Sequence, residues 1–101
     1  MDKVREKEFA ETMTFYLHGT RGLPIGLIQV LIGEPPDIEK LKTLFDIALV
    51  LTDTLTLKAL EAWLNAKFKA FDNERPADLF KKGEAWRVLE QAKIFARMEN
   101  L

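Results

Sequence analysis

The sequence contains no cysteine and no serine, and it has a single histidine, His18. Without cysteine there is no disulfide framework, no thiol nucleophile and no thiolate metal site. Because serine is missing too, the common acyl-transfer nucleophiles are absent, and one histidine leaves at most one imidazole for metal binding or base catalysis. We therefore expect a protein that is not an enzyme, holds no metal or other cofactor, and resides in the reducing cytoplasm.

The sequence also lacks long apolar runs and a strong excess of charge of either sign. The longest uncharged stretch, residues 22–33, is too short to cross a bilayer, so we expect neither export nor membrane insertion. The net charge is −1, with basic and acidic residues mixed along the chain, which gives no electrostatic footprint for nucleic acid or an anionic membrane. No glycine loop suited to phosphate is present, and His18 is expected at a helix end or on the surface.

What the chain does have is enough apolar material for one core. Hydrophobic residues make up 48% of 101 residues, which suits one globular domain and leaves no room for a second core. Apolar residues recur at helical spacing, and no segment shows the sustained alternation of a half-buried strand. The sequence predicts an all-α fold, a compact single-domain bundle of five to six helices.

Start and stop signals set the expected helices. Pro24 and Pro76 suit first turns, Asp37 can cap a third helix, and Gly83 separates the last two. Six helices are thus expected, over residues 2–17, 24–32, 37–51, 54–64, 76–80 and 84–99. The alternative start of the fourth helix is residue 56. Gly19 is expected to supply the left-handed stop of the first helix. Val4 is expected to point inward. The helix that carries the all-apolar run 47–51 is predicted to be the central, most buried helix of the bundle.

Four short pieces of the second half stand in a recognisable order. They are Trp63-Leu64-Asn65, then Pro76-Ala77-Asp78-Leu79-Phe80, then Gly83-Glu84, then Arg87-Val88-Leu89. Together they resemble the signature of the toxin-binding domain of bacterial Xre/MbcA/ParS-type antitoxins, over about residues 38–98. The motif positions that carry the resemblance are Trp63, Leu64, Pro76, Leu79, Gly83, Val88 and Leu89.

The loop between the first two pieces departs from the family pattern. Lys67, Phe68 and Lys69 stand where relatives carry Asn-Pro, and Asp72-Asn73 stand where relatives carry Gly-Gly. Since Asp and Asn are the non-glycine residues most tolerant of the left-handed region, the turn is expected to survive.

The resemblance implies a function and a division of the chain. Residues 37–101 would be the toxin-binding helical domain, and residues 1–36 a helical pair in place of a helix-turn-helix unit that is truncated or absent. The implied partner is a cognate protein toxin, in this family usually a RES-domain enzyme that consumes NAD and whose active site the antitoxin blocks. No Lys or Arg occurs between Gly22 and Glu39, which argues against operator binding. A DNA-binding regulator and a helical homo-oligomeric module are the alternatives, and a homodimer stays open.

The last helix carries apolar residues on two sides. At about 100° per residue, Ala85, Val88, Leu89, Ala92, Phe95 and Ala96 form a core face. Ile94, Met98 and Leu101 fall opposite, beside Arg87 and Gln91. This second side is either a further internal contact with the N-terminal helices or a surface for a partner. Because the C-terminal part of the family domain faces the toxin, the resemblance makes Arg87, Gln91, Ile94, Met98 and Leu101 the candidate toxin-binding residues.

Overall fold

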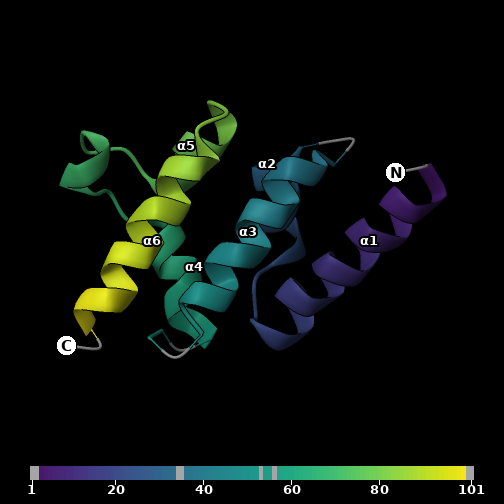
Figure 1. Ribbon diagram of the computed structural model, residues 1–101, viewed down its shortest axis with the longest axis horizontal. Coiled ribbons are helices and arrows are strands. Elements are labelled where there is room, and N and C mark those ends of the chain that lie inside the picture. The colour runs from purple at the N-terminus through teal and green to yellow at the C-terminus, as the bar shows by residue number, and fades with distance from the viewer. Residues whose placement is uncertain (1–2, 34–35, 53, 56, 100–101) are drawn as a thin grey trace.

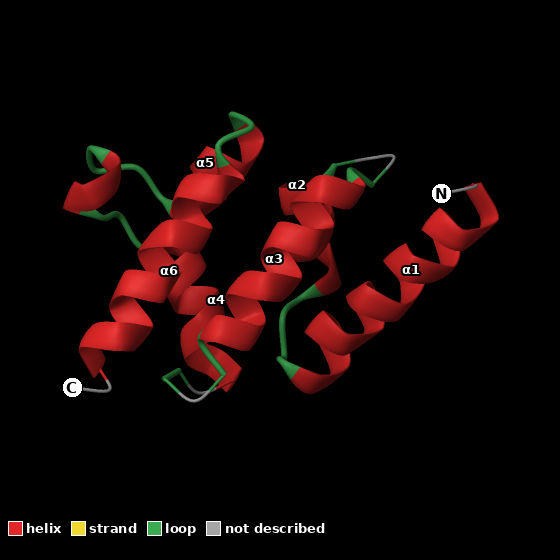
Figure 2. Ribbon diagram, in the orientation of Figure 1, coloured by secondary structure: helices red, strands yellow, loops and turns green. Residues whose placement is uncertain are grey.

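Helix α3 (Ile38–Val50) lies in the middle of the molecule, with α1 (Lys3–Phe15) on one side and α6 (Ala85–Glu99) on the other (Figure 1). The computed structural model describes residues 3–33, 36–52, 54–55 and 57–99. The remaining helices are α2 (Ile25–Ile32), α4 (Leu57–Asn65) and α5 (Pro76–Lys81), with a π-helical turn at Tyr16–Thr20 and a 3-10 turn at Lys69–Phe71. Over the described ranges no strand occurs, which confirms the all-α prediction (Figure 2).

The core runs along α3. Leu41, Leu44, Ile47 and Ala48 are buried on this helix. Helices α1, α2 and α6 all pack on α3, while α5 packs on α2, α4 and α6. The radius of gyration, 13.2 Å, is close to the roughly 13 Å expected of one domain of about 100 residues, so the bundle forms a single compact body. Within the described residues, no helix is long and apolar enough to span a bilayer.

The predicted caps and stops of three helices are confirmed. The Asp37 carboxylate accepts a hydrogen bond from the backbone N–H of Lys40 at 3.2 Å, which satisfies a free donor of the first turn of α3. Pro76 is the first residue of α5, where its missing N–H costs nothing. Gly83 adopts a φ of +80° between α5 and α6, a conformation that favours glycine.

Several expectations about burial and boundaries are wrong. Val4 is exposed, because α1 lies at the edge of the bundle and its outer side meets no other helix (Figure 1). Leu49 is exposed as well, since the neighbours of α3 leave one side of that helix to solvent. Helix α1 ends at Phe15 and continues directly into the π-helical turn Tyr16–Thr20, so the positive φ expected at Gly19 belongs to Gly22.

Of the two expected starts of the fourth helix, Thr54 is wrong. The helix begins at Leu57, and Thr54 lies in the turn before it. The alternative start at Thr56 lies outside the described residues, as does the expected first residue of the chain's first helix, Asp2.

The two glycines Gly83 and Gly26 should respond in opposite ways to alanine. Gly83→Ala is expected to lower the free energy of unfolding by roughly 1–2 kcal/mol, because an L-residue is strained in the left-handed region. Gly26→Ala is expected to raise it by about 0.4–1 kcal/mol, because Gly26 is helical and an added Cβ would meet nothing within 4 Å. Urea denaturation followed by circular dichroism measures both, and equal shifts of the same sign would contradict the assigned backbone conformations.

Candidate protein-binding surface

Helix α6 packs on α3 and α5 through one face and leaves the opposite face outward. Ala85, Val88 and Ala92 are buried, and Leu89, Phe95 and Ala96 are half-buried against the same core. The small alanine side chains let the helix backbone approach its neighbours closely. The predicted core face of the last helix is therefore confirmed.

Two of the predicted binding residues are exposed to solvent on the outward face of α6. Ile94 is 46% exposed and Met98 is 67% exposed. The alternative that these two side chains pack internally on the N-terminal helices is therefore wrong. Arg87 and Gln91 lie beside them and are half-buried, and we call Arg87, Gln91, Ile94 and Met98 the outer α6 surface. Leu101, the fifth predicted residue, lies outside the described residues.

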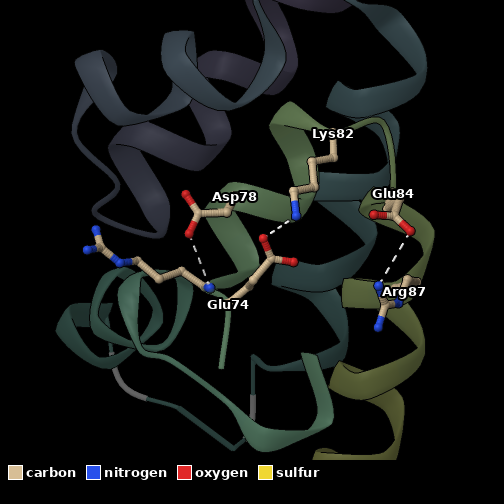
Figure 3. A network of polar contacts seen from close by, with 6 residues as sticks. Glu74, Asp78, Lys82, Glu84 and Arg87 are labelled. Atoms are coloured by element: carbon tan, nitrogen blue, oxygen red, sulfur yellow. Dashed lines mark hydrogen bonds and ion pairs between the residues drawn. The ribbon is translucent and has the colours of Figure 1, made fainter. Parts of the chain in front are cut away.

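Arg87 makes contacts that tie it to the protein itself. Its Nη1 lies 3.4 Å from Oε1 of Glu84, one turn earlier (Figure 3), and its guanidinium carbon lies 5.8 Å from the ring centroid of Phe71. A cation over an aromatic face is attractive, so Arg87 links α6 to the loop that holds Phe71. Arg87 therefore supports the fold as well as bordering the exposed pair.

The loop between α4 and α5 is held by an aromatic cluster. Trp63 on α4 lies 5.4 Å from Phe68 and 6.4 Å from Phe95 between ring centroids, and Phe68 lies 5.9 Å from Phe71. Trp63 is buried among these rings, so one large side chain joins α4, the loop and α6. Its indole Nε1 has no hydrogen-bond partner among the described residues.

The turn of this loop uses two residues with positive φ. Asp72 has a φ of 57° and Asn73 a φ of 67°, as predicted for the positions where the family carries glycines. The backbone N–H of Asn73 donates to the carbonyl of Phe68 at 2.9 Å, and the N–H of Phe68 donates to the carbonyl of Glu74 at 3.2 Å. These hydrogen bonds close the loop on itself.

Polar contacts then fasten the loop to α5. Lys82 donates to the Glu74 carboxylate, and the backbone N–H of Arg75 donates to the Asp78 carboxylate at 3.3 Å (Figure 3). The hydrogen bond that Lys82 donates to Glu74 raises the pKa of Lys82 above its usual value. Since these charges are satisfied within the chain, they serve the scaffold that carries α6.

Most of the motif positions lie in the interior of the bundle. Trp63, Leu64, Pro76, Leu79 and Val88 are buried, Leu89 is half-buried, and Gly83 makes the exposed turn between α5 and α6. The buried positions stabilise the helical body and the exposed glycine lets the chain reverse. They are thus separate from the outer α6 surface that they support.

Trp86 is an exposed residue that the sequence analysis missed. It is 63% exposed and borders a hollow of about 290 Å³ at the start of α3, together with Asp37, Lys40 and Thr43. At about 100° per residue Trp86 lies about 80° from Ile94 and outside the core face, so helical spacing would have identified it as exposed. Trp86 gives α6 a second exposed apolar position on a different side.

His18 lies where the sequence predicted, exposed in the turn that ends the first helical segment. Its Nδ1 lies 2.9 Å from the carbonyl oxygen of Leu23, so this nitrogen carries the proton and donates. No group of three or more metal-ligating side chains was found in the part of the chain that the structure describes.

Comparison with known proteins gives a partial match. A curated protein of Mycobacterium tuberculosis, named "Probable mycobacterial cidal antitoxin", is 36% identical to this chain over 61 residues. Those residues make up 60% of this chain and 53% of that protein, so the chain spans about half the length of the curated relative it matches. No family model matches the sequence. No solved structure matches it either.

The contacts of Arg87 and Met98 predict unequal effects of alanine on stability. Arg87→Ala is expected to lower the free energy of unfolding by about 1 kcal/mol, because it removes the cation from the Phe71 ring and the partly exposed pair with Glu84. Met98→Ala is expected to change it by less than about 0.5 kcal/mol, because Met98 is a surface residue. Urea titrations of both variants measure this, and a loss at Met98 as large as that at Arg87 would show that Met98 is packed.

Proposed function

We propose that this chain is an antitoxin-like protein that binds a cognate protein toxin through the outer α6 surface and blocks the toxin's active site by covering it. The exposed pair Ile94 and Met98 on the rigidly held α6 carries the proposal. The partial similarity to a protein named as a mycobacterial cidal antitoxin supports it from an independent direction. The mode of action is stoichiometric occlusion, in which this chain performs no catalysis and needs no cofactor.

The physical support is the cost of leaving this surface uncovered. Burying a fully exposed apolar side chain of this size contributes about 1.5–3 kcal/mol, and Ile94 and Met98, at 46% and 67% exposed, would contribute a corresponding fraction of it. Ile94 and Met98 are one turn apart on the same side of α6, so a single apolar patch of a partner can cover both. Arg87 and Gln91 border the pair and offer hydrogen-bond donors at its rim, the arrangement that protein interfaces commonly show.

The class of toxin and the division of the chain that we propose follow the motif resemblance. On that basis the toxin is a RES-domain enzyme that consumes NAD, residues 37–101 form the toxin-binding unit, and residues 1–36 form a helical pair that stands in the place of a DNA-binding unit. The order and spacing of the motif pieces that contain Trp63, Pro76 and Gly83 support this assignment. The site of action we propose is the cytoplasm, where such a toxin meets NAD.

The test is capture of the toxin encoded beside this chain's gene by tagged variants of the chain. The double variant Ile94→Asp plus Met98→Asp should lose capture, because a partner would have to bury two unpaired carboxylates. It should also fail to protect cells that express the toxin. Binding is measured by co-purification and isothermal titration, with a loss of at least about 100-fold in affinity expected for two central contacts.

Val4→Asp is the matched control. Val4 is exposed to the same degree as Met98, but it lies on α1, at the opposite edge of the bundle (Figure 1). This variant should capture the toxin and protect cells as the unaltered chain does. Undiminished capture by the α6 double variant would remove the outer α6 surface as the binding site, and a neighbouring gene that encodes no toxin would remove the proposed function.

DNA binding is not offered as a second function, because no observation favours it. Helix α2 carries no charged residue, and Gln29 is its one polar side chain, so it lacks the basic side chains that contact phosphates. A mobility-shift experiment on the DNA upstream of the gene should show no shift by the chain alone at low salt. A shift that weakens as salt rises would contradict this expectation.

A further inference from the structure

Arg21 is a charged side chain in the interior of the protein, and the function proposed for α6 does not use it. It lies between the π-helical turn Tyr16–Thr20 and α2, and it is 5% exposed. Among the described residues it is the one polar or charged residue that is buried. Its neighbours Thr20 and Gly22 are exposed, so the backbone runs at the surface while the Arg21 side chain is buried beneath it.

The guanidinium of Arg21 has two nitrogens without a hydrogen-bond partner. Nε and Nη2 are both closed to solvent, and neither has an acceptor in the part of the chain that the structure describes. The ion pairs found among the described residues do not include Arg21. Because arginine stays protonated in proteins, the positive charge cannot be relieved by loss of a proton. A buried charge with no counter-charge and no acceptor is costly, so Arg21 calls for a ligand.

The two unsatisfied nitrogens share one edge of the planar guanidinium. The N–H of Nε and one N–H of Nη2 point in nearly the same direction, and two oxygens of a carboxylate or phosphate can accept from both at once. A water molecule can also accept from both donors, but it is neutral and leaves the charge unbalanced. An oxyanion satisfies both donors and balances the charge. The position of the unsatisfied atoms therefore fits one class of ligand.

We propose that Arg21 forms an internal anion-binding site that takes a small oxyanion, a carboxylate or a phosphate, through Nε and Nη2. Because both nitrogens are closed to solvent, a surface loop or side chain of another protein does not reach them in the folded chain. The ligand is therefore a small molecule that enters during a local opening of the native structure. The proposal does not rest on the antitoxin role, and its tests contain no toxin.

The first experiment asks whether the ligand-free protein balances the charge of Arg21. Methionine keeps much of the apolar stem of arginine and removes the guanidinium. Arg21→Met should therefore leave the urea midpoint in sodium chloride unchanged or raise it, because an unbalanced buried charge is removed. A lower midpoint would show that the chain itself satisfies the guanidinium, and would overturn the proposal.

The second experiment compares sodium phosphate and sodium acetate with sodium chloride at one pH and one ionic strength. At least one of the two oxyanions should raise the urea midpoint of the unaltered chain and reach saturation binding behaviour, because a ligand of the folded state stabilises it. The two salts distinguish a phosphate site from a carboxylate site. Arg21→Met should abolish the shift. Arg21→Lys should weaken binding at least about 10-fold, because an ammonium lacks the pair of parallel donors.

Arg97→Met is the matched control for both salts. It removes the same charge, but from an exposed position on α6, so the shift in midpoint should be kept. Neither oxyanion acting on the unaltered chain, or a shift that Arg21→Met retains, would overturn the proposal.

A nuclear magnetic resonance titration gives a signal that does not depend on stability. Because Nε of Arg21 is closed to solvent, its N–H should exchange slowly with water and give a resonance that is missing from Arg21→Lys. The stabilising anion should move this resonance with the dissociation constant obtained from the urea midpoints. A resonance that neither phosphate nor acetate moves would contradict binding at this edge of the guanidinium.

Discussion

The fold depends on α3 being covered from several directions at once. Leu41, Leu44, Ile47 and Ala48 cannot all be buried by one neighbour, so α1, α2 and α6 must pack around the same helix. In a chain of this length the apolar area of one helix is a large part of the total that stabilises the native state. The cost of exposing α3 is therefore what keeps the N-terminal and C-terminal helices in one body.

Because α3 is central, α1 and α6 become the two outer edges, and each has one buried and one exposed side. On α6 the small residues Ala85 and Ala92 face inward, which brings the backbone close to the core and lifts the larger Ile94 and Met98 outward. The aromatic cluster around Trp63 then holds α6 against the α4–α5 loop. The exposed pair is thus presented on a helix whose orientation is fixed on two sides, so binding of the proposed partner would cost little conformational entropy.

Local signals in the sequence predicted local structure well. Asp37, Pro76 and Gly83 act through the backbone groups next to them, so their roles as cap, first turn and stop could be deduced without knowing the neighbours. The same holds for Asp72 and Asn73, whose tolerance of positive φ is a property of the residue type. The core face of α6 followed from helical spacing alone.

What the sequence could not supply was the number of neighbours around each helix. The run 47–51 is apolar on every side, yet Leu49 is exposed because no element covers that side of α3, and Val4 is exposed because α1 is an edge helix. The ties of Arg87 to Glu84 and Phe71 also depend on where the loop folds back, which no spacing rule encodes. The outward position of Ile94 and Met98 could be predicted because it depends only on helix geometry.

The unequal burial of the two tryptophans gives the molecule two separate optical reporters. Trp63 is packed among Phe68 and Phe95, whereas Trp86 stands in solvent near the start of α3. A dissolved collisional quencher should therefore extinguish the emission of Trp86 and spare that of Trp63. In a Trp86→Phe variant the tryptophan emission would come from Trp63 alone and would report the packing of the core. In the unaltered chain the emission of Trp86 would also report changes at the surface of α6.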